Sequence, residues 1–182
     1  MAELETECRS LDGTALVGTV TPPSGRATGL AVLAHGAGVT RHEGGLFTRI
    51  AAALAGAGIQ CLRFDLRAHG SSGGRPQDIT IAAVANDIKA AADHLRAESG
   101  LRRPVHLIAA SFSGGAAALH AAHRPTEASA WCCSTPGSTT ASGTSPAVRT
   151  PTPAATCPRR RRRRCRGKDS RSAVRSGWAA RC

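Results

Sequence analysis

The chain has 182 residues, a formal net charge of +12 and an aromatic content of 3%, with no tyrosine and a single methionine. This length suits one domain, and the shortage of aromatic side chains argues against a large core. No apolar run approaches the ~18–20 residues that span a bilayer, so we expect no membrane partner. The basic charge is local: residues 1–125 hold 12 Lys and Arg against 10 Asp and Glu, whereas residues 126–182 hold 12 against 2.

Cysteine is also unevenly distributed, since five of the seven cysteines lie after residue 131. Their spacing contains no C-x-x-C pair and no histidine partner set, so we predict no zinc site. The odd cysteine number and the acidic opening MAELETE argue against secretion. We therefore expect a reducing, cytoplasmic setting.

The predicted elements alternate along the first two-thirds of the chain. A β-hairpin comes first, because Asp12-Gly13 separates two strand-like runs within residues 3–23. Apolar runs and helical spacing then predict a strand at Gly29–His35, a helix at Leu46–Ala57, a strand at Ile59–Phe64, a helix over 81–95 ending near Gly100, a strand at Val105–Ala110 and a helix at Gly114–Ala122. Such alternation predicts right-handed βαβ units and an α/β fold with a doubly wound, mostly parallel sheet.

The composition changes after Pro125. Residues 126–182 contain no Leu, Ile, Met or Phe, and six arginines run from Arg159 to Arg164. Such a segment cannot bury enough apolar surface to offset ~1–2 kcal/mol of backbone entropy per residue, so we predict a disordered basic tail. The segment EASAWCCSTPGSTT can be translated back into GC-rich codons. Shifting the reading frame of that DNA by two bases permits GVCVVLLNPGLDY, which has the pattern of a buried strand followed by a turn. We therefore interpret the tail as an out-of-frame extension.

Ser111 lies where a buried strand turns sharply into a helix, in the run Ala109-Ala110-Ser111-Phe112-Ser113-Gly114-Gly115. A nucleophilic serine on such a turn needs small residues two positions away on each side, and Ala109 and Ser113 are small. In this interpretation Ser113 only has to be small. The alternative is an ordinary serine in an Ala-rich segment, and the strand–turn–helix context favours the nucleophile.

A second motif, His35-Gly36-Ala37-Gly38, follows the first buried strand. Acyl transfer to a serine needs donors for the oxyanion, and losing one typically raises the barrier by ~3 kcal/mol. The main-chain N–H groups of Ala37 and Phe112 are the predicted donors. The alternative is a plain Gly-rich loop between strand and helix.

The segments VLAHGAG, LFTRIAAALAGAGIQ, RFDLRAHGSSGG and VHLIAASFSGGAAAL follow in an order that resembles the N-terminal part of the α/β-hydrolase superfamily, in its bacterial feruloyl-esterase and serine-aminopeptidase-like branch. The resemblance covers roughly residues 10–125. It implies a truncated α/β-hydrolase fold followed by the tail of 126–182, and hydrolysis of a small ester or amide through an acyl-serine. It implies no metal and no organic cofactor.

The family places its acid and then its histidine after the serine. Downstream of Ser111 the only histidines are His120 and His123, and the only acids are Glu127 and Asp169. A helical rise of ~1.5 Å per residue carries both histidines away from the serine hydroxyl. A serine without its base is a poor nucleophile, so we expect the chain as written to be inactive.

Two further expectations concern Asp65 and the arginine run. Asp65 ends a strand, and we interpret it as a loop-bracing carboxylate, not as the catalytic acid. The run Arg159–Arg164 has no aromatic stacking residues beside it, so we expect no nucleic-acid partner. The alternative that stays open is a non-catalytic, hydrolase-like protein with a basic nucleic-acid-binding tail. The sequence does not determine the oligomeric state.

Overall fold

The computed structural model describes residues 3–134. Its strands are β1 (Leu4–Arg9), β2 (Ala15–Thr21), β3 (Gly29–Ala34), β4 (Ile59–Phe64), β5 (Val105–Ala110) and β6 (Ala128–Ser134). Its α-helices are α1 (Leu46–Gly56), α2 (Ile81–Ser99) and α3 (Phe112–His123), and two short 3-10 helices are η1 (Glu43–Gly45) and η2 (Pro76–Asp78).

The strands form one mixed sheet in the order β1-β2-β4-β3-β5-β6. Strands β1 and β2 form an antiparallel hairpin, and β2 also pairs with β4 in the antiparallel direction. Strands β4, β3, β5 and β6 are parallel to one another. The predicted hairpin and parallel sheet are therefore confirmed. Parallel strands end at a common edge, so the loops after β3, β4 and β5 meet there, and these are the loops that carry the predicted site residues.

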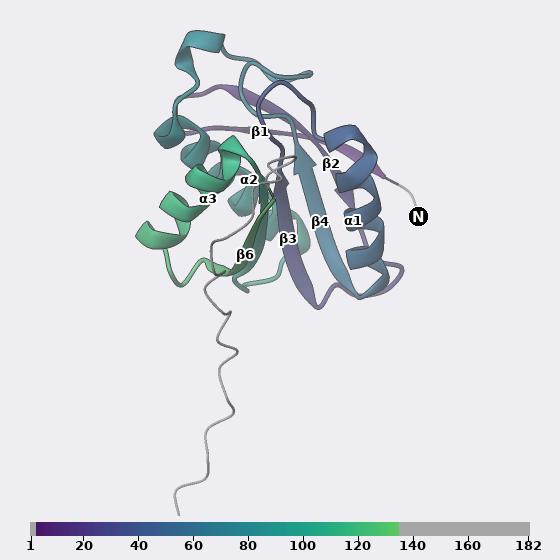
Figure 1. Ribbon diagram of the computed structural model, residues 1–182. Helices are drawn as coiled ribbons and strands as arrows, with labels where there is room; N and C mark the ends of the chain where they lie inside the picture. The colour runs from purple at the N-terminus through teal and green to yellow at the C-terminus, as the bar shows by residue number, and fades with distance from the viewer. Residues whose placement is uncertain (1–2, 135–182) are drawn as a thin grey trace, which may run out of the picture. The chain divides into compact units, whose positions relative to one another are not determined.

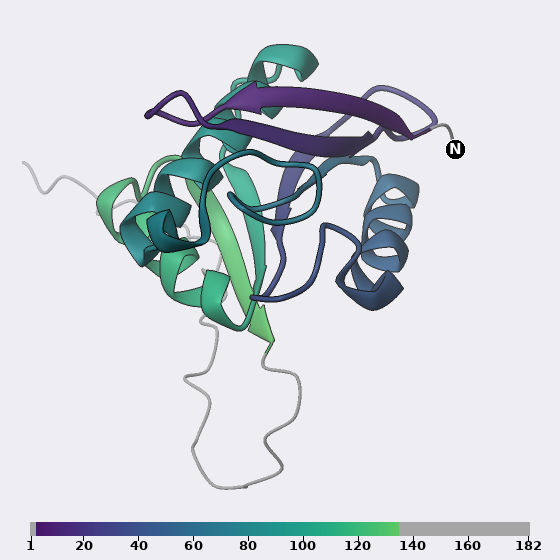
Figure 2. The same cartoon turned by 90° about the horizontal axis from the view of Figure 1, so that it is seen from above.

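Helices cover both faces of the sheet (Figures 1 and 2). Helices α2 and α3 lie on one face, where Leu16, Val32, Leu62, Ile88 and Leu95 are members of the larger core cluster. Helix α1 lies on the other face over a smaller cluster formed by Ala31, Leu33, Phe47, Ala51, Cys61 and Ala110. The alternation of buried side chains along each strand explains both clusters, since successive residues point to opposite faces.

The sheet continues past residue 125, where the sequence predicts the end of the hydrolase part. Ala128–Ser134 form β6, which pairs in parallel with β5 from Val105↔Ala128 to Ala110↔Ser134. The physical reason is the open edge of β5, whose main-chain N–H and C=O groups accept a neighbouring strand with little regard to its side chains. The rest of the predicted tail, residues 135–182 with Arg159–Arg164 and Asp169, lies outside the described residues.

Helix α3 begins at Phe112, two residues before the predicted start at Gly114. None of the helices within residues 3–134 is long and apolar enough to cross a membrane. In the same part of the chain, no group of three or more His, Cys, Asp or Glu residues could hold a metal ion.

Candidate active site

Ser111 occupies the tight turn between β5 and α3. Its backbone has φ 51° and ψ −118°, a conformation that L-residues rarely adopt, and its side chain is exposed. The residues two positions away, Ala109 and Ser113, are small, as this turn requires, and Gly36 packs against it: a Cβ on Gly36 would lie 3.4 Å from the Ser111 Cβ. The turn places the Ser111 hydroxyl at the N-terminus of α3, where main-chain N–H groups lack intrahelical acceptors.

Ser113, by contrast, is buried and points away from solvent. Its Oγ donates a hydrogen bond of 2.5 Å to the main-chain oxygen of His35. The prediction that Ser113 only has to be small is therefore incomplete, because the hydroxyl also ties the first turn of α3 to the end of β3. Of the two serines, only Ser111 is placed to meet a substrate.

The β3–α1 loop presents three consecutive main-chain amides near Ser111. The Gly36 N–H donates to Oε2 of Glu43 over 2.8 Å, and the Gly38 N–H donates to Nε2 of His69 over 3.2 Å. Between them, Ala37 is exposed, and no acceptor within residues 3–134 takes its N–H. Two side chains thus hold the outer amides, and the middle one has no acceptor in the described part of the chain.

Backbone strain is concentrated in the same place. Within residues 3–134, three non-glycine residues have positive φ: Glu43 at 45°, Ala68 at 57° and Ser111 at 51°. They lie in the three loops that follow β3, β4 and β5. Such conformations cost on the order of 1–3 kcal/mol each and persist where the surroundings over-determine them, most often at functional sites.

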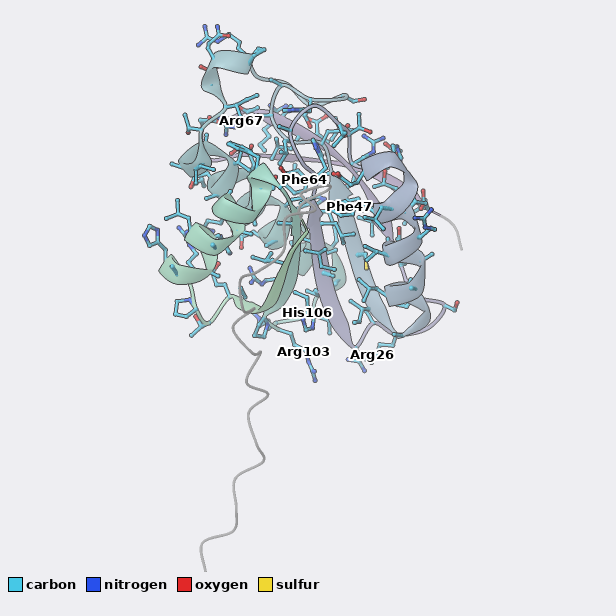
Figure 3. All side chains as sticks on the ribbon, viewed as in Figure 1. Arg26, Phe47, Phe64, Arg67, Arg103 and His106 are labelled. Carbon is cyan, nitrogen blue, oxygen red and sulfur yellow. The ribbon has the colours of Figure 1, made fainter. Side chains whose placement is uncertain are left out.

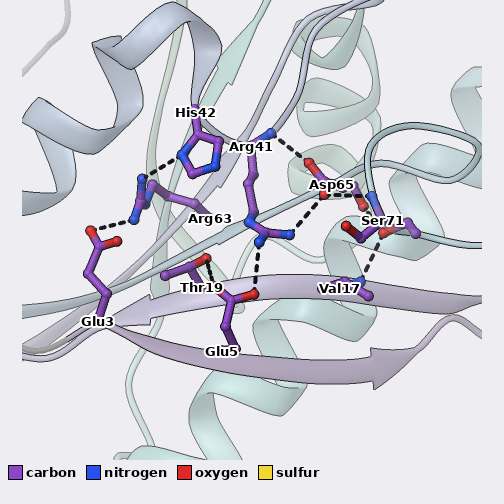
Figure 4. A network of polar contacts seen from close by, with 10 residues as sticks. Glu3, Glu5, Val17, Thr19, Arg41, His42, Arg63, Asp65 and Ser71 are labelled. Carbon is purple, nitrogen blue, oxygen red and sulfur yellow. Dashed lines mark hydrogen bonds and ion pairs between the residues drawn. The ribbon is translucent and has the colours of Figure 1, made fainter.

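Asp65 braces the loops after β3 and β4 (Figure 4). Its carboxylate accepts hydrogen bonds from Arg41 N at 2.7 Å, Arg41 Nη1 at 2.9 Å and Ser71 N at 3.0 Å. Arg41 also donates to Oε2 of Glu5 over 2.8 Å, which links the loop to the hairpin. Because these contacts saturate a carboxylate that is 2% exposed, Asp65 has the bracing contacts that the sequence predicts.

Two histidines join the same loops. His35 is buried; its Nδ1 lies 2.7 Å from the carbonyl oxygen of Gly36, and its Nε2 accepts from Leu66 N over 2.9 Å. A carbonyl can only accept, so the proton is on Nδ1 and the ring is neutral. Burial lowers the pKa of His35, which opposes its charging. His35 therefore shapes the loop and does not serve as a proton carrier for Ser111.

The structure brings no base to Ser111 from the histidines downstream of it. His120 is 1% exposed on α3, and neither ring nitrogen has a hydrogen-bond partner within the described part of the chain. Burial lowers the pKa of His120 as well. His120 and His123 lie at the far end of the helix that Ser111 begins, as the spacing predicts.

A hollow of about 560 Å³ lies at the other end of the sheet. The end of α2, the α2–β5 connection and the end of the α3–β6 loop line it, among them Arg96, Arg103 and Glu127. Figure 3 shows Arg103, with His106 and Arg26, at the end of the sheet opposite Arg67. Ligands of open α/β sheets bind at the carboxyl ends of the strands, so we assign no part of the reaction to this hollow.

The sequence proposes Ser111, Ala37 and Phe112 as site residues, and it does not predict that Glu43 and His69 hold the loop. Both lie in loop segments of the sequence. Glu43 accepts a hydrogen bond from a residue 7 positions away and His69 from one 31 positions away, and these contacts form only in the folded protein. The only local signal was that both are acceptors within Gly-rich loops following buried strands.

Comparison with known proteins agrees with this fold. Residues 25–173 match the family model described as "Serine aminopeptidase, S33". The α/β-hydrolase GrgF from Penicillium aligns with a TM-score of 0.63 and 24% identity, over 73% of this chain and 45% of GrgF. The esterase Pf2001 from Pyrococcus furiosus aligns with a TM-score of 0.60 and 22% identity, over 73% of this chain and 49% of the esterase.

Epoxide hydrolase A from Mycobacterium thermoresistibile is a third similar structure, with a TM-score of 0.59 and 19% identity over 72% of this chain and 39% of that protein. At these identities the likeness shows the fold alone. The chain spans less than half the length of each of the three proteins. A search of curated sequences found no match.

Proposed function

Because this chain belongs to the serine aminopeptidase family of hydrolases, we propose that it is a serine hydrolase of carboxylic esters or related acyl compounds, with Ser111 as its nucleophile. The substrate is a small ester or amide, and no cofactor takes part. In the reaction, the Ser111 Oγ attacks the acyl carbon, the alcohol or amine leaves, and water then releases the acid from the acyl-serine.

The observation that carries this proposal is the conformation of Ser111. A strained, exposed serine with φ 51° and ψ −118°, at the end of a buried strand and the start of a helix, is what a nucleophile turn requires. A serine with only a packing role has no reason to retain this strain, since glycine would relieve it.

The main-chain N–H groups of Ala37 and Phe112 supply the oxyanion hole in this proposal. Phe112 is the first residue of α3, so its N–H has no intrahelical acceptor and lies at the positive end of the helix dipole. The Ala37 N–H lies in the loop that approaches Ser111 at Gly36. Two such donors act on the charge that develops in the transition state.

The chain as written lacks a positioned base and acid, so we expect p-nitrophenyl acetate hydrolysis to stay near the uncatalysed rate. A turnover number within the ordinary enzyme range of ~1–10³ s⁻¹ would contradict this expectation. We further propose that residues 1–125 are the N-terminal part of the hydrolase domain and that 126–182 are an out-of-frame extension. A corrected frame would then continue with an Asp or Glu and a His. The cytoplasmic setting stays a prediction.

Labelling with a fluorophosphonate probe tests the nucleophile directly in the full chain. Mass spectrometry of the digested protein should locate the probe on Ser111, slowly because the base is missing. Ser111→Ala should remove the label. Ser113→Ala is the matched control: it should keep the label while lowering the melting temperature, because it loses the hydrogen bond to His35. Label on another serine, or none at all, would refute the proposal.

A second candidate function rests on the charge of residues 126–182, including Arg159–Arg164. A non-catalytic protein with a nucleic-acid-binding tail would bind mixed DNA or RNA with strong salt dependence and lose binding when cut after Pro125. Fluorescence anisotropy with a labelled oligonucleotide decides this. We expect no binding at physiological salt, and tight binding together with an unlabelled Ser111 would favour this second function.

A further inference from the structure

His69 holds the loop that carries the proposed oxyanion donor, and its contacts define its protonation state. Its Nδ1 lies 2.9 Å from the main-chain oxygen of Arg67, and its Nε2 lies 3.2 Å from the N–H of Gly38. The carbonyl only accepts and the amide only donates. The ring must therefore be neutral, with its proton on Nδ1 and a lone pair on Nε2.

The carbonyl that fixes this tautomer is itself held firmly. The Arg67 guanidinium makes two hydrogen bonds to the buried carboxylate of Asp87 on α2, at 2.9 and 2.6 Å, and a third to Asp12 at 2.7 Å. Asp87 is fully buried. The β4 loop also closes on itself, since Ala68 N donates to Gly73 O over 2.7 Å. The segment that carries His69 is thus held by side-chain and main-chain hydrogen bonds.

Gly38, on the other side of the contact, is exposed and has open space around its Cα. Its φ is +79°, and a Cβ placed on it would meet nothing within 4 Å. The hydrogen bond that the Gly38 N–H donates to His69 ties this residue to the loop after β4, while Glu43 accepts from Gly36 two residues earlier. Ala37 lies between these two attachments, so the direction of its N–H depends on both.

We propose that His69 is a positioning residue for the oxyanion loop and that its protonation at Nε2 releases the loop. This inference rests on the proposed function of Ser111 and Ala37. A proton on Nε2 would place an N–H against the N–H of Gly38, so the hydrogen bond between Gly38 and His69 is lost. The Ala37 N–H is then no longer held in the direction of the oxyanion. The site is therefore assembled when His69 is neutral and disassembled when it is charged.

Other charged groups surround this contact and define the controls. His35 packs against His69 with ring centroids 5.2 Å apart. Asp65 and Glu43 lie near enough to His35 to favour its charged form, while Arg41 and Arg67 are paired with Asp65 and Asp87. Both histidines use both ring nitrogens in internal hydrogen bonds, but His35 is buried and His69 is half-buried, so of the two only His69 is accessible to solvent.

NMR of the ¹⁵N-labelled full chain tests the contact without requiring activity. A ¹⁵N–¹⁵N coupling across the hydrogen bond between Gly38 N and His69 Nε2 should be present at neutral pH, with the Nδ1–H tautomer. On acidification the coupling should vanish, and the Gly38 amide shift should follow the His69 ring with one midpoint. An Nε2–H tautomer, or a Gly38 amide that ignores the titration of His69, would overturn the proposal.

Variants separate positioning from packing. In His69→Gln the side-chain oxygen can still accept from Gly38, so the amide should remain protected while its pH dependence disappears. In His69→Ala the Gly38 amide should exchange with solvent about tenfold faster, as expected for one lost hydrogen bond. His94→Gln is the matched control, since His94 bonds Thr6 far from this loop, and it should leave Gly38 unchanged.

The fluorophosphonate reaction then links the contact to Ser111. The labelling rate of the wild-type chain should fall on acidification with the His69 midpoint, and His69→Gln should lose that fall while keeping the neutral-pH rate. Equal rates and pH profiles in wild type and His69→Ala would sink the positioning role but leave the nucleophile intact. Absence of label in every variant would refute the nucleophile, while the NMR measurements would still decide the role of His69.

Discussion

The two edges of the parallel sheet solve the same problem, a sharp reversal of the chain, in different ways. At the amino edge the turns before β4 and β5 use glycine: Gly58 has φ +83° and Gly100 has φ +68°. At the carboxyl edge the chain places Glu43, Ala68 and Ser111 in equally left-handed conformations. Glycine adopts these angles without steric cost, and residues with a Cβ do not.

The carboxyl edge also has more polar contacts that cross between loops. Asp65 and His69 each accept a hydrogen bond from the main chain of the β3–α1 loop, 24 and 31 residues away in the sequence, and Glu43 accepts one from Gly36 within that loop. At the amino edge the charged side chains are more exposed, as in the pair Arg96–Asp93, whose side chains are 20% and 48% exposed. Within residues 3–134, non-glycine residues with positive φ therefore occur where side-chain contacts hold the loops in place.

The sharpest test of this comparison substitutes one glycine at each edge. A Cβ on Gly70 would lie 2.2 Å from Oδ2 of Asp65, at φ +51°. Since Arg41 and Ser71 hold that carboxylate, it cannot retreat, and Gly70→Ala should destabilise the fold by about 4 kcal/mol. Gly100→Ala meets nothing within 4 Å and should cost only about 1–2 kcal/mol. Urea unfolding measures both, and equal losses would contradict the comparison.

Removing one carboxylate at each edge should give the next largest difference. Asp65→Ala leaves the half-buried Arg41 without its main partner and should lower the free energy of unfolding by about 3 kcal/mol. Asp93→Ala removes exposed ion pairs with Lys89 and Arg96, which are worth about 0–1 kcal/mol. Chemical denaturation gives both values. A loss from Asp93→Ala as large as that from Asp65→Ala would show that the loops are not held as described.

The stability of the fold should fall in mild acid. Burial lowers the pKa of His35 and of His120 in the folded protein, whereas in the unfolded chain a histidine titrates near ~6.5. The unfolded state therefore takes up protons first, and stability that is present above pH ~6.5 is lost as the pH falls below it. Each histidine contributes a slope of up to about 1.4 kcal/mol per pH unit.

His120→Leu checks which part of that slope belongs to the α3 helix. His120 has two buried nitrogens without partners in the described residues, so its replacement should flatten the acid slope by about one proton and not reduce stability at pH 8. His123→Leu is the control, because His123 is exposed. Thermal melts at pH 5, 6 and 8 measure how stability depends on pH. If His120→Leu leaves that dependence unchanged, His120 is not a source of the loss of stability in acid.

The smallest expected effect is a gain. Ser111→Gly should relieve the strained turn and raise the free energy of unfolding by about 1 kcal/mol, while abolishing fluorophosphonate labelling. Ala110→Gly, at a residue of β5 with ordinary backbone angles, should lose stability instead. A lower free energy of unfolding in Ser111→Gly would contradict the view that the backbone of Ser111 is strained.

The sequence predicted the strands best. Ile59–Phe64 and Val105–Ala110 were predicted with the bounds that the structure has, because a strand buried on both faces is a continuous apolar run that turns interrupt. The start of α3 was missed by two residues, although Ser111, its N-cap, is a residue type preferred at that position. Strand β6 was missed because ASAWCCS has no periodic pattern, and its order comes from pairing with β5.

The candidate site divides in the same way. Local sequence alone proposes Ser111, Ala37 and Phe112 as site residues and Asp65 as a bracing carboxylate, because a nucleophile turn and an oxyanion loop are short segments with fixed places beside buried strands. Only the tertiary structure identified Glu43 and His69, the neutral tautomers of His35 and His69, and the hydrogen bond that makes Ser113 more than a small residue. These depend on which loops meet at one edge of the sheet, and pairing between strands distant in sequence decides that.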